Sequence, residues 1–184
     1  MTTPTQAWEV LRQADQLYAV PEVDAAITRL AEEIGARLGA QNPIFVCLMN
    51  GAVVFFGRLL PRLGFPLEVD YIHATRYGSR LKGGEMEWVA GPYVSFRGRT
   101  VVLVDDILDE GATLAAIEAR YRHDGAEQVY KVVLVEKERA RTVPMVADFV
   151  GLKVPDRYVF GYGMDYKGYL RNAPGIYAVK EGTS

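Results

Sequence analysis

Three carboxylates lie within five residues of one another near the middle of the chain. Asp105 and Asp106 directly follow the apolar residues 101–104, and Asp109 comes three positions later. Four apolar residues without polar alternation predict a strand that is buried on both faces, as in a parallel sheet. Because open α/β sheets bind ligands at the carboxyl ends of their strands, these acids are candidates for binding a metal ion or a sugar, or for accepting a proton.

The loop after these acids is suited to a phosphate group. Gly111 permits a tight turn, Thr113 adds a hydroxyl, and a helix is predicted over residues 113–123. The N–H groups at a helix N-terminus bind anions. The alternative interpretation is a strand, a solvated acidic turn and an ordinary helix cap. Three acids before one Gly-x-Thr favour the ligand-binding interpretation.

Composition narrows the class of protein. The chain has 184 residues, which suits one domain, and 49% of them are apolar, so a sizeable core is possible. The net charge of −2, from 21 basic and 23 acidic residues, gives no reason to expect a nucleic-acid or membrane partner. The single cysteine, Cys47, suits a reducing compartment. Without an N-terminal secretory signal or an apolar run of roughly 20 residues, a cytoplasmic protein is expected.

Strands and helices alternate along the rest of the chain. This alternation predicts an α/β fold with a mostly parallel sheet. A polar segment over residues 74–87 is predicted to be a mobile loop, because long loops in compact domains are usually functional. Helices are predicted at residues 7–19, 23–39, 53–60 and 113–123, and strands at residues 43–48, 65–73, 101–104, 129–135, 147–152 and 157–162, with a short strand or hairpin at 88–96.

Four further residues gain interest from their position. Lys137 is predicted to lie just beyond the strand at 129–135, and alone it would be a solvated loop lysine. Tyr158 alone would be a core aromatic residue, and Asp165 and Arg171 would be surface charges. Since several strand ends converge on one crevice in such sheets, all four are candidates for the same site.

Several stretches resemble one enzyme family. Residues 101–114 resemble the phosphoribosyl-pyrophosphate signature of type I phosphoribosyltransferases. Residues 47–52, 75–78 and 148–171 resemble the pyrophosphate loop, the start of the mobile loop and the base-binding segment of hypoxanthine-guanine phosphoribosyltransferases. The resemblance runs from about residue 23 to residue 179. It implies the type I fold, a twisted sheet flanked by helices, in a single domain over residues 1–184, with a core at about 40–137 and a hood from the N-terminal region and about 138–184.

The resemblance also implies a reaction in purine salvage. A 6-oxopurine (hypoxanthine or guanine) would displace pyrophosphate from phosphoribosyl pyrophosphate, with Mg²⁺ as cofactor, giving IMP or GMP. Asp105 and Asp106 would bind the ribose hydroxyls and help to hold Mg²⁺, and Asp109 would take the proton from purine N7. The implied phosphoribosyl-pyrophosphate site is Asp105, Asp106, Asp109, Glu110, Gly111, Ala112 and Thr113.

The remaining roles follow the same resemblance. Pyrophosphate would be bound by the main-chain amides of Met49, Asn50 and Gly51, across a strained or cis Met49–Asn50 bond, and by Arg171. Lys137 would contact the 6-oxo group, Tyr158 would stack on the purine, the Val159 backbone would read its edge, and Asp165 would complete this site and touch a second Mg²⁺. Arg76 and Tyr77 of the mobile loop would close over the site.

Three positions depart from the family pattern. Asn50 stands where many members have lysine, and Ala52 stands where they have glycine. Glu110 stands where serine or threonine is usual, and a carboxylate facing a phosphate would be repelled. We therefore predict that Glu110 points outward and contributes only its N–H group.

Two alternatives to this function stay open. A xanthine-preferring phosphoribosyltransferase would share every residue above. A nucleotide-sensing regulator that binds RNA would need a clustered basic face, whereas the arginines here are spread along the chain, in pairs such as Arg139 with Arg141. The resemblance further implies a homodimer or a homotetramer.

Overall fold

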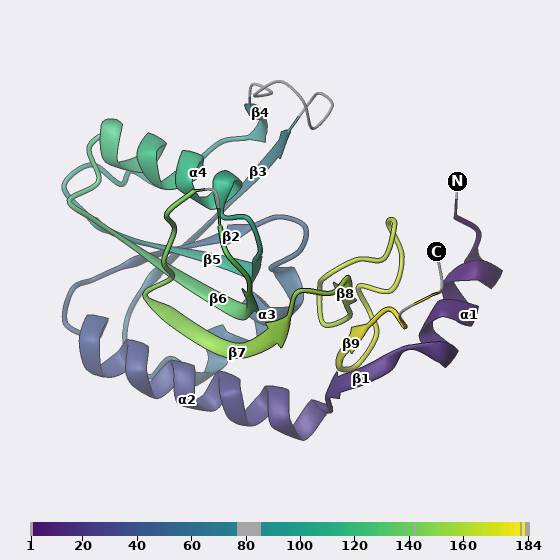
Figure 1. Cartoon of the computed structure of the whole chain (residues 1–184). Helices are drawn as coiled ribbons and strands as arrows, with labels where there is room; N and C mark the ends of the chain where they lie inside the picture. The colour runs from purple at the N-terminus through teal and green to yellow at the C-terminus, as the bar shows by residue number, and fades with distance from the viewer. Residues whose placement is uncertain (1, 77–85, 142, 181, 183–184) are drawn as a thin grey trace.

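The structure is a computed structural model of the chain, and it describes residues 2–76, 86–141, 143–180 and 182. A large sheet forms its centre, and a small sheet lies beside it (Figure 1). The strand order in the large sheet is β4 (Met86–Ala90), β3 (Glu68–Arg76), β2 (Ile44–Leu48), β5 (Thr100–Leu108), β6 (Gln128–Glu138) and β7 (Phe149–Pro155).

The large sheet is mostly parallel, as predicted. Strands β3, β2, β5, β6 and β7 pair in parallel, and only β4, at the edge, is antiparallel to its neighbour. Every residue of β2 and of the first half of β5 is buried. This burial explains the uninterrupted apolar runs, because a strand covered on both faces has no solvent side to alternate with.

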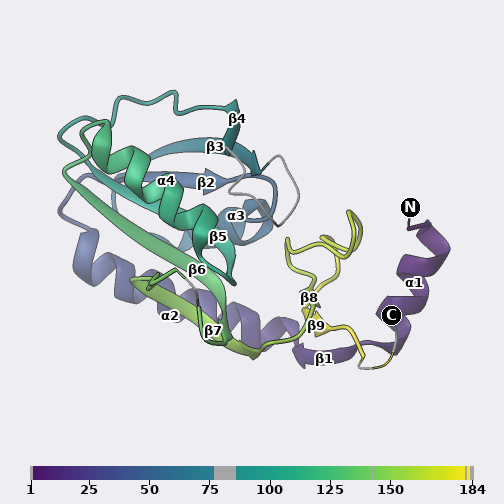
Figure 2. The same cartoon turned by 45° about the horizontal axis from the view of Figure 1, so that its top comes forward.

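Helices cover both faces of the large sheet. Helix α2 (Val20–Leu38) and helix α3 (Val53–Leu59), which the 3₁₀ turn η1 (Leu60–Arg62) follows, lie on one face, and α4 (Ala112–His123) lies on the other (Figures 1 and 2). A stripe of fully buried side chains fixes α2 against the sheet: Ile27, Leu30, Ile34 and Leu38. Within the described ranges, no helix is both long and apolar enough to cross a membrane.

The small sheet joins the two ends of the chain. It consists of β1 (Asp15–Tyr18), β9 (Ile176–Ala178) and β8 (Val159–Phe160), all antiparallel, and helix α1 (Pro4–Gln13) precedes it. Figure 1 shows both termini on this side of the molecule. The predicted core boundary at residue 138 does not coincide with the division between the sheets, because β7 belongs to the large sheet.

The helix predicted at residues 7–19 is wrong beyond Gln13. Ala14 has an extended backbone (φ −66°, ψ 148°), and Asp15–Tyr18 pairs with β9 instead. Pro21 lies in the first turn of α2, where its missing N–H is not needed. Leu11, Ala14 and Tyr18 follow one another at steps of three and four residues, as in a helix. This local pattern could not show that Asp15–Tyr18 pairs with a strand about 160 residues away.

Strand ends also differ from the prediction. Strand β5 does not stop before its acids but runs through them, since Asp105 pairs with Val133 and Leu108 with Glu136. Likewise Lys137 lies within β6, where it pairs with Val154, and not beyond the strand. Strand β3 extends to Arg76 and β4 starts at Met86, so residues 74–76 and 86–87 of the predicted loop lie in strands, and the rest of that loop lies outside the described residues. Charged residues ended the apolar runs in the sequence without ending the ladders.

Candidate active site

The first part of the site is the pair Asp105 and Asp106, in the last half of β5. Asp106 is 9% exposed, and its backbone N–H donates to Asp105 Oδ1 at 3.0 Å. In the part of the chain that the structure describes, neither acid forms an ion pair. Burial, and then the neighbouring charge of Asp106, raise the pKa of Asp105 well above its usual value. Burial also raises the pKa of Asp106, although Asp105 and Arg171 partly oppose this.

The loop between β2 and α3 lies directly against Asp106. Its Met49–Asn50 peptide bond is cis, one of the two possibilities that the sequence left open. A Cβ atom on Gly51 would come within 2.1 Å of Asp106 Oδ2, so only glycine allows this approach. On the other side, a Cβ atom on Gly163 would come within 2.1 Å of the Gly51 carbonyl oxygen. The loop is therefore held between β5 and the C-terminal segment.

Arg171 reaches the same place from the C-terminal segment. One of its nitrogens, Nη1, donates to the Gly163 carbonyl at 2.7 Å, and Nη2 pairs with Asp165 Oδ1 at 2.7 Å. Its charge also opposes part of the rise in the pKa of Asp106. Gly51 and Arg171, more than a hundred positions apart in sequence, thus lie near one end of β5.

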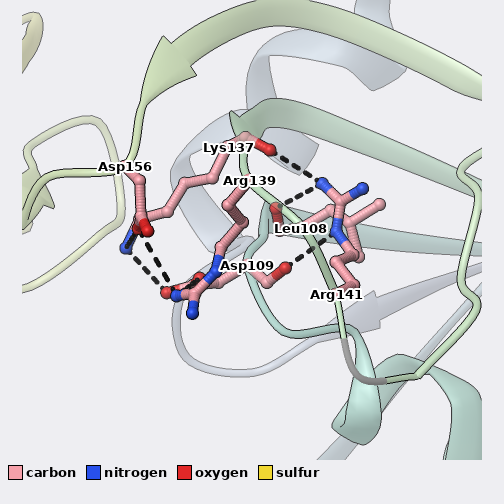
Figure 3. Close-up of polar contacts among 6 residues, drawn as sticks. All are labelled: Leu108, Asp109, Lys137, Arg139, Arg141 and Asp156. Carbon is pink, nitrogen blue, oxygen red and sulfur yellow. Dashed lines mark hydrogen bonds and ion pairs between the residues drawn. The ribbon is translucent and has the colours of Figure 1, made fainter.

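The third acid, Asp109, has very different surroundings. Lys137 Nζ contacts Asp109 Oδ2 at 2.7 Å, and Arg139 Nη1 contacts Oδ1 at 3.0 Å (Figure 3). Asp156 completes the cluster, 3.4 Å from Arg139 Nη1 and 3.9 Å from Lys137 Nζ. Burial raises the pKa of Asp109, but the hydrogen bonds and charges of Lys137 and Arg139 together outweigh burial, so the pKa is lowered.

Two members of this cluster were missed by the sequence interpretation. Arg139 was noted only as one of a basic pair, and Asp156 only as an unnamed residue of the stretch 148–171. Lys137, for which a solvated loop was the simplest expectation, is 9% exposed. The signal that could have found Arg139 and Asp156 is their position near the carboxyl ends of β6 and β7, next to the end of β5.

The predicted phosphate loop begins helix α4. Gly111 is the N-cap residue, has φ +79° and carries no side chain that could cap the helix. The N–H groups of Ala112 and Thr113, in the first turn, therefore have no acceptor within the helix. A Cβ atom on Gly111 would come within 2.7 Å of Met145 Cβ. Glu110 is exposed to solvent, and its predicted outward orientation stays a prediction.

The predicted purine contacts lie on the neighbouring segment. Tyr158 is 48% exposed, and its ring meets that of Tyr166 edge-on at 5.5 Å, so it is not a core residue. It follows Asp156, a member of the Lys137 cluster, by two residues in sequence and precedes the buried Val159 of β8. Asp165 is partly exposed and bound to Arg171.

The three predicted metal ligands do not form one cluster. Among the described residues, no group of three acidic, histidine or cysteine side chains is arranged to hold a metal ion. Asp165 is thus not joined with Asp105 and Asp106 in one site. Two adjacent carboxylates still fit Mg²⁺, which is commonly bound by one or two carboxylates together with substrate phosphates and water.

The two residues predicted for the mobile loop are Arg76 and Tyr77. Tyr77 lies outside the described residues. Arg76 is the last residue of strand β3. Its predicted role stays a prediction.

The fold and these side chains define a class of protein. It is an α/β protein with acidic residues and a lysine–aspartate pair at the ends of its strands, next to a helix whose N-cap residue is glycine. Residues 13–167 match the phosphoribosyl transferase domain, so the chain belongs to that family. The family resemblance and the fold class predicted from the sequence are confirmed.

Individual proteins agree with this membership. The chain is 34% identical over 165 residues to the bifunctional protein TilS/HprT of Listeria innocua, which is 89% of this chain but only 26% of that protein. It is 33% identical over 159 residues to the hypoxanthine-guanine phosphoribosyltransferase of Bacillus subtilis, covering 84% of this chain and 88% of that one. A crystal structure of a hypoxanthine-guanine phosphoribosyltransferase from Bacillus anthracis superposes with a TM-score of 0.82 at 25% identity, over 90% of this chain and 98% of the other.

Proposed function

We propose that the protein transfers the 5-phosphoribosyl group from phosphoribosyl pyrophosphate to hypoxanthine or guanine, in purine salvage. The observation that carries the proposal is the contact between Lys137 Nζ and Asp109 Oδ2 at 2.7 Å. Asp109 lies three residues beyond Asp106. A 6-oxopurine has its O6 and N7 on one edge. An ammonium for O6 beside a carboxylate for the N7 proton therefore matches this edge.

The sugar and its phosphate fit the neighbouring groups. Asp105 and Asp106 accept hydrogen bonds from the ribose hydroxyls, for which ionised carboxylates are suitable acceptors. The loop from Asp109 to Thr113 binds the 5′-phosphate through backbone N–H groups at the start of α4, with the Thr113 hydroxyl added. Glu110, exposed in the structure, contributes its N–H alone.

The leaving pyrophosphate lies at the other end of the site. The main-chain amides of Met49, Asn50 and Gly51 bind it, and Arg171 neutralises part of its charge. Asp105 and Asp106 help to hold Mg²⁺, and Asp165 contacts a second ion. When bound, Mg²⁺ neutralises charge that develops on the leaving group. Positioning and charge stabilisation then carry the rate, because an oxocarbenium-like transition state needs little covalent help.

The purine lies between Lys137 and the Tyr158 ring. Stacking on such a ring contributes about 1–3 kcal/mol per base. The Val159 backbone reads the ring edge. Asp109 accepts the N7 proton, although in the free protein its lowered pKa makes it a weak base. Movement of Lys137 from Asp109 to O6 removes one of the two cations that lower this pKa, so base binding itself makes Asp109 more basic.

The proposed oligomer is a homodimer or a homotetramer. An apolar face supports it: Val53 on α3, Val69 and Tyr71 on β3, and Tyr93 are 44% to 94% exposed and line a common groove. A second copy of the chain would remove this surface from water. Light scattering of the wild type and of Tyr71→Glu tests the assignment: dimers or tetramers that dissociate in the variant support it, and a monomeric wild type contradicts it. A cytoplasmic location suits the free, buried Cys47.

A rate comparison tests the function. Purified protein is mixed with phosphoribosyl pyrophosphate, Mg²⁺ and hypoxanthine, guanine or xanthine in turn, and nucleotide formation is followed. We expect IMP and GMP to form faster than XMP. A higher rate with xanthine would reassign the base preference, and no nucleotide from any of the three would contradict a transferase altogether.

A further inference from the structure

The support beneath the phosphate loop comes from a neighbouring connection. The ladder between β5 and β6 ends at the pair Leu108 and Glu136. Asp109 lies one residue beyond, so this ladder offers no partner for its backbone carbonyl. A backbone carbonyl in a partly buried place needs a hydrogen-bond donor.

Arg141 provides that donor from the connection between β6 and β7. Its Nε donates to the Asp109 carbonyl at 2.8 Å, and its Nη2 donates to the carbonyls of Lys137 at 2.9 Å and Leu108 at 3.4 Å (Figure 3). Its Nη1 pairs with Glu136 Oε1 at 3.1 Å, and the side chain is only 15% exposed. The rigid fork of an arginine can reach several acceptors at once, which a lysine cannot do in the same geometry.

The same connection touches the loop at two more places. Arg139 binds the Asp109 carboxylate, and Met145 fills the space above Gly111 that a side chain there would occupy. The backbone and the carboxylate of Asp109, and the glycine that starts α4, are thus all held by the segment that follows β6.

We propose that Arg141 is a positioning residue for phosphoribosyl transfer, an inference that rests on the proposed function. It ties the carbonyls of Leu108 and Asp109, at the start of the phosphate loop, to that of Lys137, which carries the purine contact. It thereby fixes the distance between the phosphate subsite and the base subsite without touching either substrate. Displacing a reacting group by about 1 Å can cost on the order of 100-fold in rate.

Arg29 offers a matched control. It also donates to two backbone carbonyls, those of Val150 and Gly151, and it pairs with Glu33 at 2.8 Å. It lies on α2, on the face of the sheet opposite α4 (Figure 1). Removing it costs a comparable set of contacts away from the strand ends that form the site.

The experiment compares Arg141→Ala with Arg29→Ala in steady-state kinetics. We expect Arg141→Ala to lower kcat/KM for phosphoribosyl pyrophosphate by on the order of 10- to 100-fold, with a raised KM for that substrate, and added guanidinium ion at millimolar levels to restore part of the loss. Arg29→Ala should stay within about twofold of the wild type. Equal values for the two variants, or a loss without any guanidinium rescue, overturn the proposal.

A second measurement does not depend on activity. Hydrogen–deuterium exchange of residues 109–114 in the substrate-free protein should speed up in Arg141→Ala and not in Arg29→Ala. Arg141→Lys, which keeps the charge beside Glu136 but loses the fork, serves where the alanine variant does not fold and should show the same acceleration. Unchanged exchange overturns the positioning role. A wild type without transferase activity contradicts the proposed function alone, because the exchange result still decides whether Arg141 holds the loop.

Discussion

The two acidic parts of the site are neighbours in sequence but opposites in charge environment. Asp106 is buried beside the partly buried Asp105, and loss of solvation raises the pKa of each. Asp109, three residues on, is held by Lys137 and Arg139, and its pKa is lowered. The boundary between them is the end of the β5–β6 ladder, at Leu108.

The difference separates two kinds of chemistry. Carboxylates that form no ion pair with a protein side chain favour a ligand that supplies hydrogen-bond donors or positive charge, as a ribose with Mg²⁺ does. A carboxylate already paired with cations becomes a base only when a ligand draws one of them away. We therefore propose that the same residue type serves binding at the end of β5 and proton transfer just past it, because neighbouring strands bring different partners.

The largest effect is expected at Asp109. Replacing it with asparagine removes the proton acceptor, and we expect turnover to fall on the order of 10²- to 10⁴-fold. The affinity for phosphoribosyl pyrophosphate, measured by calorimetry, should change far less, because the loop amides remain. Equal losses in turnover and affinity would count against a base role.

A smaller but still large effect is expected at Asp106. Asp106→Asn should lower kcat/KM for phosphoribosyl pyrophosphate on the order of 10²- to 10³-fold. Its melting temperature at pH 8 should not fall. Since the pKa of Asp106 is raised in the folded protein, the wild type loses stability as pH rises through that value, and the asparagine variant avoids this loss. A clear drop in melting temperature at pH 8 would show that the charge stabilises the fold.

Gly51→Ala perturbs the first acidic region without touching the second. The new methyl group would meet Asp106 Oδ2 at 2.1 Å, and we expect a loss of up to about 100-fold in kcat/KM. Gly57→Ala is the control, because a Cβ atom there meets nothing within 4 Å. Being inside α3, it should stabilise the fold by about 0.5–1 kcal/mol and leave activity unchanged. Similar activity in the two variants would show that the close approach of Gly51 to Asp106 does not matter for catalysis.

The smallest effect concerns pH and stability. Because the pKa of Asp109 is lowered in the folded protein, its ion pairs stabilise the fold above the unfolded value of about 3.9 and are lost as pH falls through the folded value. The side chain is 38% exposed, so solvent screening limits the contribution to at most about 1 kcal/mol. Urea unfolding of the wild type and Asp109→Asn should show a difference at pH 6 that shrinks below pH 4; a difference that grows on acidification has the wrong sign.

The sequence predicted the large sheet, because the signals for its strands were local. The apolar runs at residues 44–48 and 101–104 marked buried strands, and the acids and glycine after them marked strand ends. These local signals did not show which distant segments would be partners. Asp15–Tyr18 became a strand only because β9 lies beside it, and β9 itself, three residues long, had no pattern of its own.

The set of site residues predicted from the sequence was incomplete for the same reason. That Lys137 is buried and Arg139 faces Asp109 depends on the parallel register of β5 and β6, which no local pattern records. The role proposed for Arg141 depends on where that ladder ends. Gly51 was expected only as part of a main-chain cradle, whereas its contact with Asp106 requires β2 and β5 to be neighbours.

The division of the three acids can be measured directly by NMR titration of the side-chain carboxyl carbons in ¹³C-labelled protein, with the asparagine variants used for assignment. We predict that Asp109 titrates below the usual aspartate value of about 3.9 and that Asp105 titrates well above it. If Asp105, Asp106 and Asp109 instead titrate together near pH 4, the two regions do not differ in charge environment, and the assignment of separate binding and proton-transfer roles is contradicted.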